Sequence, residues 1–313
     1  MLRAISTILV ITAVASSCAA AEVEPDCGGL YARFEFNERL ADADYPSVPP
    51  HQQHEFKRVF CKAAEEVKAW FVEQKWLPPH APAPLPSLPT SGSYLPRAQL
   101  QIFVANAYQI SRSLVPAWLG QRGRMEFPAV EAVAGEAAMA HELVHVFFPN
   151  GNRMLAEGLA VYLQQALYQQ QPPRTNPAFP NFGEDLHLLA RQYTCSAPQQ
   201  GAISLARIDL VGFDRIATPN ELRLRGGRQL DERPGPNYTV AGSFVRFLIE
   251  NLGPSETDES RIKKFYELYL TTPLVPLERD PGKVDRWKHV YGIQLADIQD
   301  KWKEHIRPLM NCP

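Results

Sequence analysis

Apolar residues recur every three or four positions between residues 56 and 76, FKRVFCKAAEEVKAWFVEQKW. This spacing places them on one face of a helix and the charged residues on the other, so it predicts an amphipathic helix. The predicted buried face consists of Phe56, Val59, Phe60, Ala63, Val67, Trp70 and Phe71. The segment that follows, LPPHAPAPLPSLPTSGSYLP, is so rich in proline that it excludes helix and interior strand and predicts a connector.

Two shorter apolar segments predict strands. The first is LQIFVAN, residues 100–106, and the second is RMEFPAVEAV, residues 124–133, which is expected at a sheet edge because Pro128 cannot donate a ladder hydrogen bond. From about residue 134 onward the spacing is mostly helical. Helices are predicted within 134–167, 183–193, 238–253, 259–270 and 295–306. A small N-terminal mixed sheet followed by a mainly helical C-terminal part indicates the α+β class.

Composition and charge narrow the class of protein. The 313 residues are 45% hydrophobic and 21% charged, which is typical of a globular chain long enough to bury a substantial core. The formal net charge is only -2. Because no strong basic field is present, a nucleic-acid partner is not expected.

The first residues, MLRAISTILVITAVASSCAAAEVEPD, have the layout of a secretory signal peptide: Arg3, an apolar run, and then small residues. That run is too short to span a bilayer, and no later run approaches the required length. Cleavage after Ala21 fits the small-x-small rule, whereas VASSC resembles a bacterial lipobox that would place a lipid anchor on Cys18. We therefore expect an exported protein, periplasmic or extracellular, with simple cleavage and lipidation both open.

Four cysteines are available for disulfides after either cleavage: Cys27, Cys61, Cys195 and Cys312. An even number in an exported chain favours two disulfides, with buried free thiols as the alternative. No CxxC motif is present, so a cysteine metal site is not expected. We predict pairing of Cys27 with Cys61, within the N-terminal region, and of Cys195 with Cys312, which would tie down the C-terminal end.

The motif HELVH, residues 141–145, points to metal chemistry. On a helix, His141 and His145 lie one turn apart on the same face, so both imidazoles can reach one ion. Glu142 is turned away from being a ligand but can take a proton from a metal-bound water. Phe148 and Gly151 stand where a metzincin would have Gly and His, which excludes that pattern.

A catalytic zinc ion requires a third protein ligand, and Glu157 is the candidate. Pro149 and the NGN sequence after it are expected to end the first helix, and RMLAEGLAVYLQQAL then starts another. Two helices joined by a short turn pack antiparallel. This would return Glu157 to the two histidines.

HELVH followed by LAEGLAVYL, residues 155–163, resembles the gluzincin clan of zinc metallopeptidases, and in particular its compact peptidase MA-like members. The resemblance implies a zincin, thermolysin-like catalytic core over 99–313, after a signal peptide at 1–21 and an N-terminal region at 22–98. It also implies one Zn²⁺ per chain held by His141, His145 and Glu157, with Glu142 as general base, and a peptide or protein substrate. Ala156 departs from the Asn of the clan's aminopeptidases, and Arg153-Met154 stands where a Trp is common.

Clan members often stabilise the oxyanion with a Tyr or His on a helix well downstream of the ligands. Tyr238 is the first candidate, because it follows Asn237, a potential N-cap, at the start of an apolar helix. His187 is the competing candidate, and a packing role for Tyr238 is the third alternative.

The segment GRMEF, residues 123–127, is similar to the strand that binds a substrate's amino terminus in clan aminopeptidases. This would give Glu126 that role, although Phe127 replaces the usual Asn. The alternative is an exposed glutamate on an edge strand.

Two other classes of protein compete with a peptidase. One is an exported zinc-binding or substrate-binding envelope protein without turnover, and the other is a structural envelope protein in which HELVH is incidental. Glu142 argues against the first, because a binding protein needs no general base.

Overall fold

The structure is a computed structural model. It describes residues 26–27, 30–36, 48–77, 99–105, 111–115, 123–135, 137–150, 152–167, 185–195, 235–271 and 285–309. The predicted signal peptide, Cys18, the connector beyond Leu77 and Cys312 lie outside the described residues. The Cys195–Cys312 pairing therefore stays a prediction.

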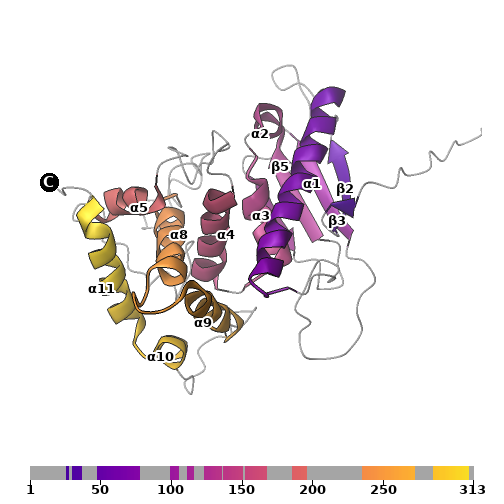
Figure 1. Ribbon diagram of the computed structural model, residues 1–313. Helices are drawn as coiled ribbons and strands as arrows, with labels where there is room; N and C mark the ends of the chain where they lie inside the picture. The colour runs from indigo at the N-terminus through magenta and orange to yellow at the C-terminus, as the bar shows by residue number, and fades with distance from the viewer. Residues whose placement is uncertain are drawn as a thin grey trace, which may run out of the picture.

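A five-stranded mixed sheet forms one end of the molecule, at the right of Figure 1. Its strands are β1 (Asp26–Cys27), β2 (Leu30–Phe36), β3 (Gln99–Ala105), β4 (Arg112–Val115) and β5 (Gly123–Pro128). The order in space is β1-β2-β3-β5-β4. Strands β2, β3 and β5 run parallel, and β1 and β4 are antiparallel to their neighbours.

The prediction of an edge strand at 124–133 is wrong. Strand β5 lies between β3 and β4 and pairs with both. Pro128 is compatible with this inner position because it is the last residue of β5, where the ladder ends. The chain then continues directly into helix α2 (Ala129–Ala134).

The sheet crosses the domain boundary predicted between residues 98 and 99. Strand β2 comes from the predicted N-terminal region, and β3 is the first strand of the predicted catalytic region. The two strands pair over all but one residue of each, from Tyr31 with Gln99 to Phe36 with Val104. The two regions therefore share one sheet and one core.

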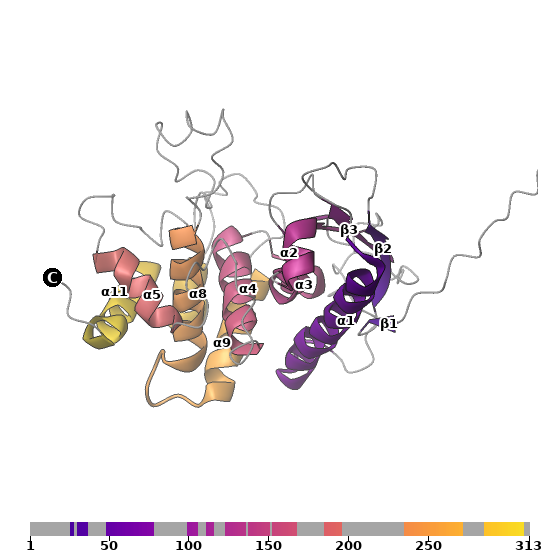
Figure 2. The same cartoon turned by 90° about the horizontal axis from the view of Figure 1, so that it is seen from above.

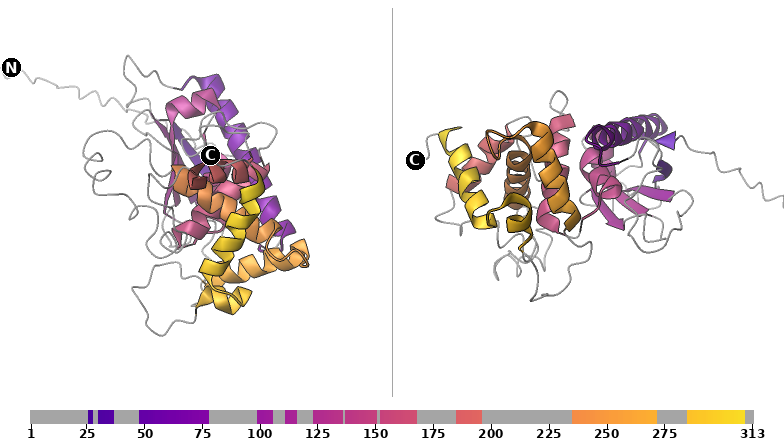
Figure 3. Two further views of the ribbon diagram at one scale, coloured as in Figure 1. Left: turned by 90° about the vertical axis from the view of Figure 1, so that its left-hand side faces the viewer. Right: turned by 60° about the horizontal axis from the view of Figure 1, so that its bottom comes forward.

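Helix α1 (Pro50–Glu73) covers one face of this sheet, as the right-hand view of Figure 3 shows. The predicted amphipathic helix is confirmed, although Val59 and Trp70 of its predicted face are only partly buried. Its aromatic residues pack edge-to-face on the strands, with the Phe56 ring 5.5 Å from that of Phe127. The apolar face of α1 thus forms the core with the sheet.

A disulfide joins Cys27 of β1 to Cys61 of α1, as predicted. The two Cα atoms are 4.3 Å apart, and 34 positions separate the residues in sequence. The crosslink fixes the first strand to the helix that covers the sheet. It restricts the unfolded chain more than the folded one.

The remaining helices begin with α3 (Met139–Phe147), which contacts strand β4 and helix α1, and the others extend away from the sheet (Figures 1 and 2). These others are α4 (Arg153–Leu167), α5 (Leu186–Cys195), α8 (Gly235–Glu250), α9 (Asp258–Thr271), α10 (Arg286–Tyr291) and α11 (Leu295–Ile306), followed by a 3-10 turn (Arg307–Leu309). Helix α3 lies next to α1, and α4 and α8 follow it; α5 and α11 lie farthest from the sheet. Within the described residues, no helix combines the length and apolar character needed to cross a membrane.

Helices α4 and α8 approach each other closely at two glycines. A Cβ atom on Gly158 would lie 2.7 Å from the main-chain oxygen of Ala241, and one on Gly242 would lie 2.1 Å from Cγ1 of Val161. Neither distance is compatible with normal van der Waals contact. The two glycines therefore allow α8 to pack closer to α4 than larger residues at these positions would permit.

Candidate metal centre

The turn between α3 and α4 is held by a small set of polar contacts. Helix α3 ends at Phe147, two residues before Pro149, as expected from the restricted backbone preceding proline. The side chain of Asn152 then accepts a hydrogen bond from the Leu155 amide at the start of α4. Tyr269 of α9 donates its hydroxyl to the main-chain oxygen of Phe148. The turn is thus fixed from both sides.

This turn brings three predicted ligands together. The Oε2 atom of Glu157 lies 3.1 Å from Nε2 of His141 and 3.2 Å from Nε2 of His145, and the two Nε2 atoms are 3.4 Å apart. Glu157 is the fifth residue of α4, which begins at Arg153 as predicted. In the described part of the chain, this is the one group of three His, Cys, Asp or Glu side chains close enough to share a metal ion.

The triangle of donor atoms fits Zn²⁺. A tetrahedral zinc ion with bonds of about 2.0 to 2.1 Å keeps its ligand atoms about 3.3 Å apart. The three measured separations, 3.1, 3.2 and 3.4 Å, match this edge length. Two imidazoles and one carboxylate are also the ligand set of a catalytic site, which leaves a fourth position open.

The protonation state of Glu157 is the one that a metal ligand requires. Burial on its own would raise the pKa of this carboxyl group, but the neighbouring imidazoles of His145 and His141 outweigh it and hold the pKa well below its usual value. The side chain is therefore a carboxylate at neutral pH, the form that binds a metal ion.

Glu142 lies in the first turn of α3 and is buried, with an exposed fraction of 6%. Its carboxylate accepts a hydrogen bond of 2.8 Å from the hydroxyl of Ser113 on β4. Ser113 was not among the residues predicted from the sequence. No local sequence signal identifies Ser113, because β4 has only four residues and its contact with α3 is long-range.

Tyr238 lies beside the predicted ligands. Its ring centre is 6.1 Å from that of His141, and the side chain is partly buried. Helix α8 begins at Gly235, so Asn237 lies inside the first turn and is not the N-cap that the sequence suggested. The close contact of α8 with α4 at Gly158 and Gly242 is what places Tyr238 at this site.

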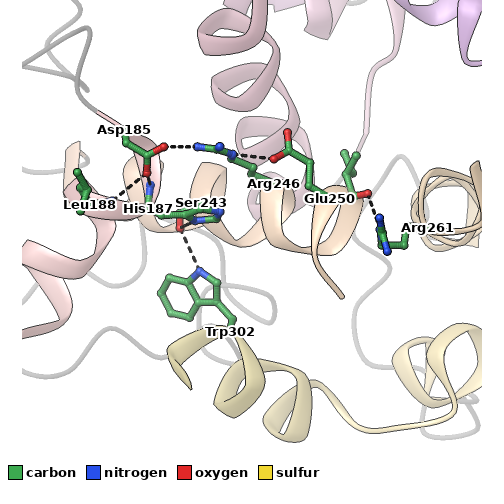
Figure 4. Close-up of polar contacts among 9 residues, drawn as sticks. Asp185, His187, Leu188, Ser243, Arg246, Glu250, Arg261 and Trp302 are labelled. Carbon is green, nitrogen blue, oxygen red and sulfur yellow. Dashed lines mark hydrogen bonds and ion pairs between the residues drawn. The ribbon is translucent and has the colours of Figure 1, made fainter. Parts of the chain in front are cut away.

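His187, the competing candidate, belongs to a different cluster (Figure 4). Its Nδ1 atom lies 2.8 Å from the hydroxyl oxygen of Ser243, which also accepts a hydrogen bond from the indole N–H of Trp302. Its ring is 5.0 Å from the ring of His305. These contacts join α5, α8 and α11. Because Ser243 is fully buried, its hydroxyl is not an accessible nucleophile.

The electrostatics of this cluster keep His187 neutral. Burial first, and then the guanidinium of Arg246, lower the pKa of His187 from 6.5 to about 4. Arg246 itself is paired with Asp185, which accepts hydrogen bonds from the first amides of α5 (Figure 4). The geometry therefore favours Tyr238 over His187 as the group near the predicted ligands.

Glu126 is neither exposed nor directed to the site. Its exposed fraction is 1%, and its carboxylate is paired with Arg112 and Arg124. Met125, the residue before it, pairs with Ser113, which faces Glu142. Because successive side chains of a strand alternate, Glu126 points to the opposite face of the sheet, and an amino-terminus-binding role is not supported.

Comparison of the chain with protein-family models, with curated proteins and with solved structures finds no match. The residues of the site therefore carry the functional argument alone.

Proposed function

We propose that the protein is an exported zinc metallopeptidase, and that His141, His145 and Glu157 hold its single zinc ion. The observation that supports the proposal is the triangle of donor atoms with edges of 3.1 to 3.4 Å, formed by two histidines of α3, the helix that also supplies Glu142, and by Glu157 of α4. The catalytic part would be a zincin core of the gluzincin type, and the substrate a peptide or protein.

The bound ion would supply a Lewis acid and a water of lowered pKa. Glu142 would act as the general base, accepting a proton from the attacking water and returning it to the leaving amine, so no covalent intermediate with the chain would be needed. The hydroxyl of Tyr238 would serve as the hydrogen-bond donor to the oxyanion that develops on the substrate. Glu142 directly follows His141 on α3, and the ring of Tyr238 on α8 lies 6.1 Å from that of His141.

The alternative is an exported zinc-binding or substrate-binding envelope protein without turnover. Such a protein would need the three ligands but not a buried carboxylate beside them. Glu142 is buried and bonded to Ser113, and this favours the peptidase.

The test starts with the purified mature protein. We expect about one zinc ion per chain, cleavage of an unstructured protein substrate, loss of cleavage after chelation and recovery when zinc is returned. Zinc at one equivalent without cleavage would identify the binding protein instead. A chain that binds no zinc would mean that HELVH is incidental.

A further inference from the structure

We propose that Ser113 is a positioning residue that holds the general base Glu142 in place from strand β4. The inference rests on the proposed function for its catalytic consequence, but its structural part can be tested separately. It is carried by the contacts between β4 and the start of α3.

The N-terminal end of α3 is held against β4 by two serines. Ser111 accepts a hydrogen bond from the amide of Ala138 at 3.4 Å and donates to the carboxylate of Glu131 at 2.7 Å. Ser113, two residues further on, donates to Glu142. Ser111 lies directly before β4 and Ser113 within it, and the hydrogen bonds of both serines reach the first residues of the helix that carries HELVH.

The hydroxyl of Ser113 has two acceptors on one residue. It lies 2.8 Å from Oε2 of Glu142 and 3.0 Å from the main-chain oxygen of the same residue. A serine hydroxyl has only one hydrogen to donate, so it serves one acceptor at a time. In either orientation it ties Glu142 to the strand.

The carboxylate of Glu142 has one hydrogen-bond partner in the described part of the chain. Ser113 is the one described side chain that bonds to its carboxylate. Its Oε1 atom has no hydrogen-bond partner among the described residues, which leaves this oxygen to take a proton. A general base must be held within hydrogen-bond reach of the proton that it removes. Ser113 therefore fixes one carboxylate oxygen and orients the other.

The experiment compares Ser113→Ala, Ser113→Thr and Ser111→Ala in the zinc-loaded protein. We expect Ser113→Ala to lower kcat by roughly 10- to 100-fold, the effect of losing one hydrogen bond to a charged group, with KM and zinc content unchanged. Ser113→Thr keeps the hydroxyl and should recover most of the loss. Ser111→Ala is the matched control, because it weakens the same contact between β4 and α3 without touching Glu142; we expect a lower Tm and an unchanged kcat.

Equal losses of kcat in Ser113→Ala and Ser111→Ala, or no recovery in Ser113→Thr, would overturn the proposal, because the serines would then act only by docking the strand. A second readout does not need activity: crystal structures of the wild type and of Ser113→Ala. We expect the Glu142 carboxylate to leave its wild-type position in the variant. An unmoved carboxylate would refute the positioning role, and this holds even if the wild type binds zinc without cleaving peptides.

Discussion

The Oε2 atom of Glu157 lies 3.1 Å from Nε2 of His141, although the two residues are sixteen positions apart and belong to different helices. Both side chains are buried. Two acceptor-capable groups are brought this close in an apolar interior only if something makes the contact favourable, such as a proton or a cation. This proximity underlies the assignment of a metal centre.

Replacing Glu157 by Gln should weaken zinc binding by far more than 10- to 100-fold, which is the usual loss when a residue that hydrogen-bonds to a metal ligand is removed. The amide is a poorer ligand because it carries no charge. The measurement is zinc retention during competition with a chelator. Glu65→Gln, on the exposed face of α1, removes a carboxylate elsewhere and should retain zinc like the wild type. Full occupancy in Glu157→Gln would remove Glu157 from the ligand set.

Replacing Tyr238 by Phe should lower kcat by roughly ten- to a thousandfold, the effect of losing one oxyanion donor. The ring is kept, so packing next to His141 and the zinc content should not change. Steady-state kinetics with zinc analysis checks this result.

His187→Ala provides the contrast for Tyr238. Its side chain is bonded to Ser243 in the cluster between α5, α8 and α11, so we expect lower stability and a kcat close to that of the wild type at a temperature where the variant is folded. Unchanged kcat in Tyr238→Phe, together with abolished turnover and retained zinc in His187→Ala, would transfer the donor role to His187.

Replacing Gly242 by Ala should destabilise the protein by about 1–3 kcal/mol, the usual cost of overpacking. In an open helix the same change would be stabilising, so the sign reports the contact with Val161. The double variant with Val161→Ala should be less destabilised than the sum of the two single variants, because the clashing methyl group is gone. Urea unfolding of all three variants measures this coupling, and strict additivity would exclude the contact.

The helices could be predicted because each carries its apolar residues at regular spacing, and HELVH places His141 and His145 on one face of a helix by local geometry alone. Strand β2 was missed even though Leu30, Ala32 and Phe34 alternate with polar residues in the expected way. Strand β4 has only four residues, too few for a pattern. The order of strands depends on long-range pairing, so neither the inner position of β5 nor the contact of Ser113 with Glu142 follows from local sequence.

The stability of the protein should fall as the pH falls from about 6.5 toward about 4, in part because of His187. Its pKa is lowered to about 4 in the folded protein and is near 6.5 when unfolded. Between these values the unfolded chain binds a proton that the folded chain does not, so acid favours unfolding. At pH 5, this difference in proton binding by His187 lowers the free energy of unfolding by about 2 kcal/mol relative to its value above pH 6.5.

Urea unfolding at pH 7.5 and pH 5 checks this dependence, with His187→Gln as the comparison. Glutamine retains hydrogen-bonding groups but does not titrate. The variant should lose less stability than the wild type between the two pH values. An identical loss in both proteins would show that His187 does not remain neutral in the fold.

The most direct test of a zinc peptidase is Glu142→Gln, measured as cleavage of an unstructured protein at matched zinc content. We predict that the variant folds and keeps one zinc ion per chain, because Glu142 lies outside the donor triangle, and that hydrolysis is lost because an amide cannot accept the proton of the water. Hydrolysis close to the wild-type rate would contradict the mechanism proposed for this site.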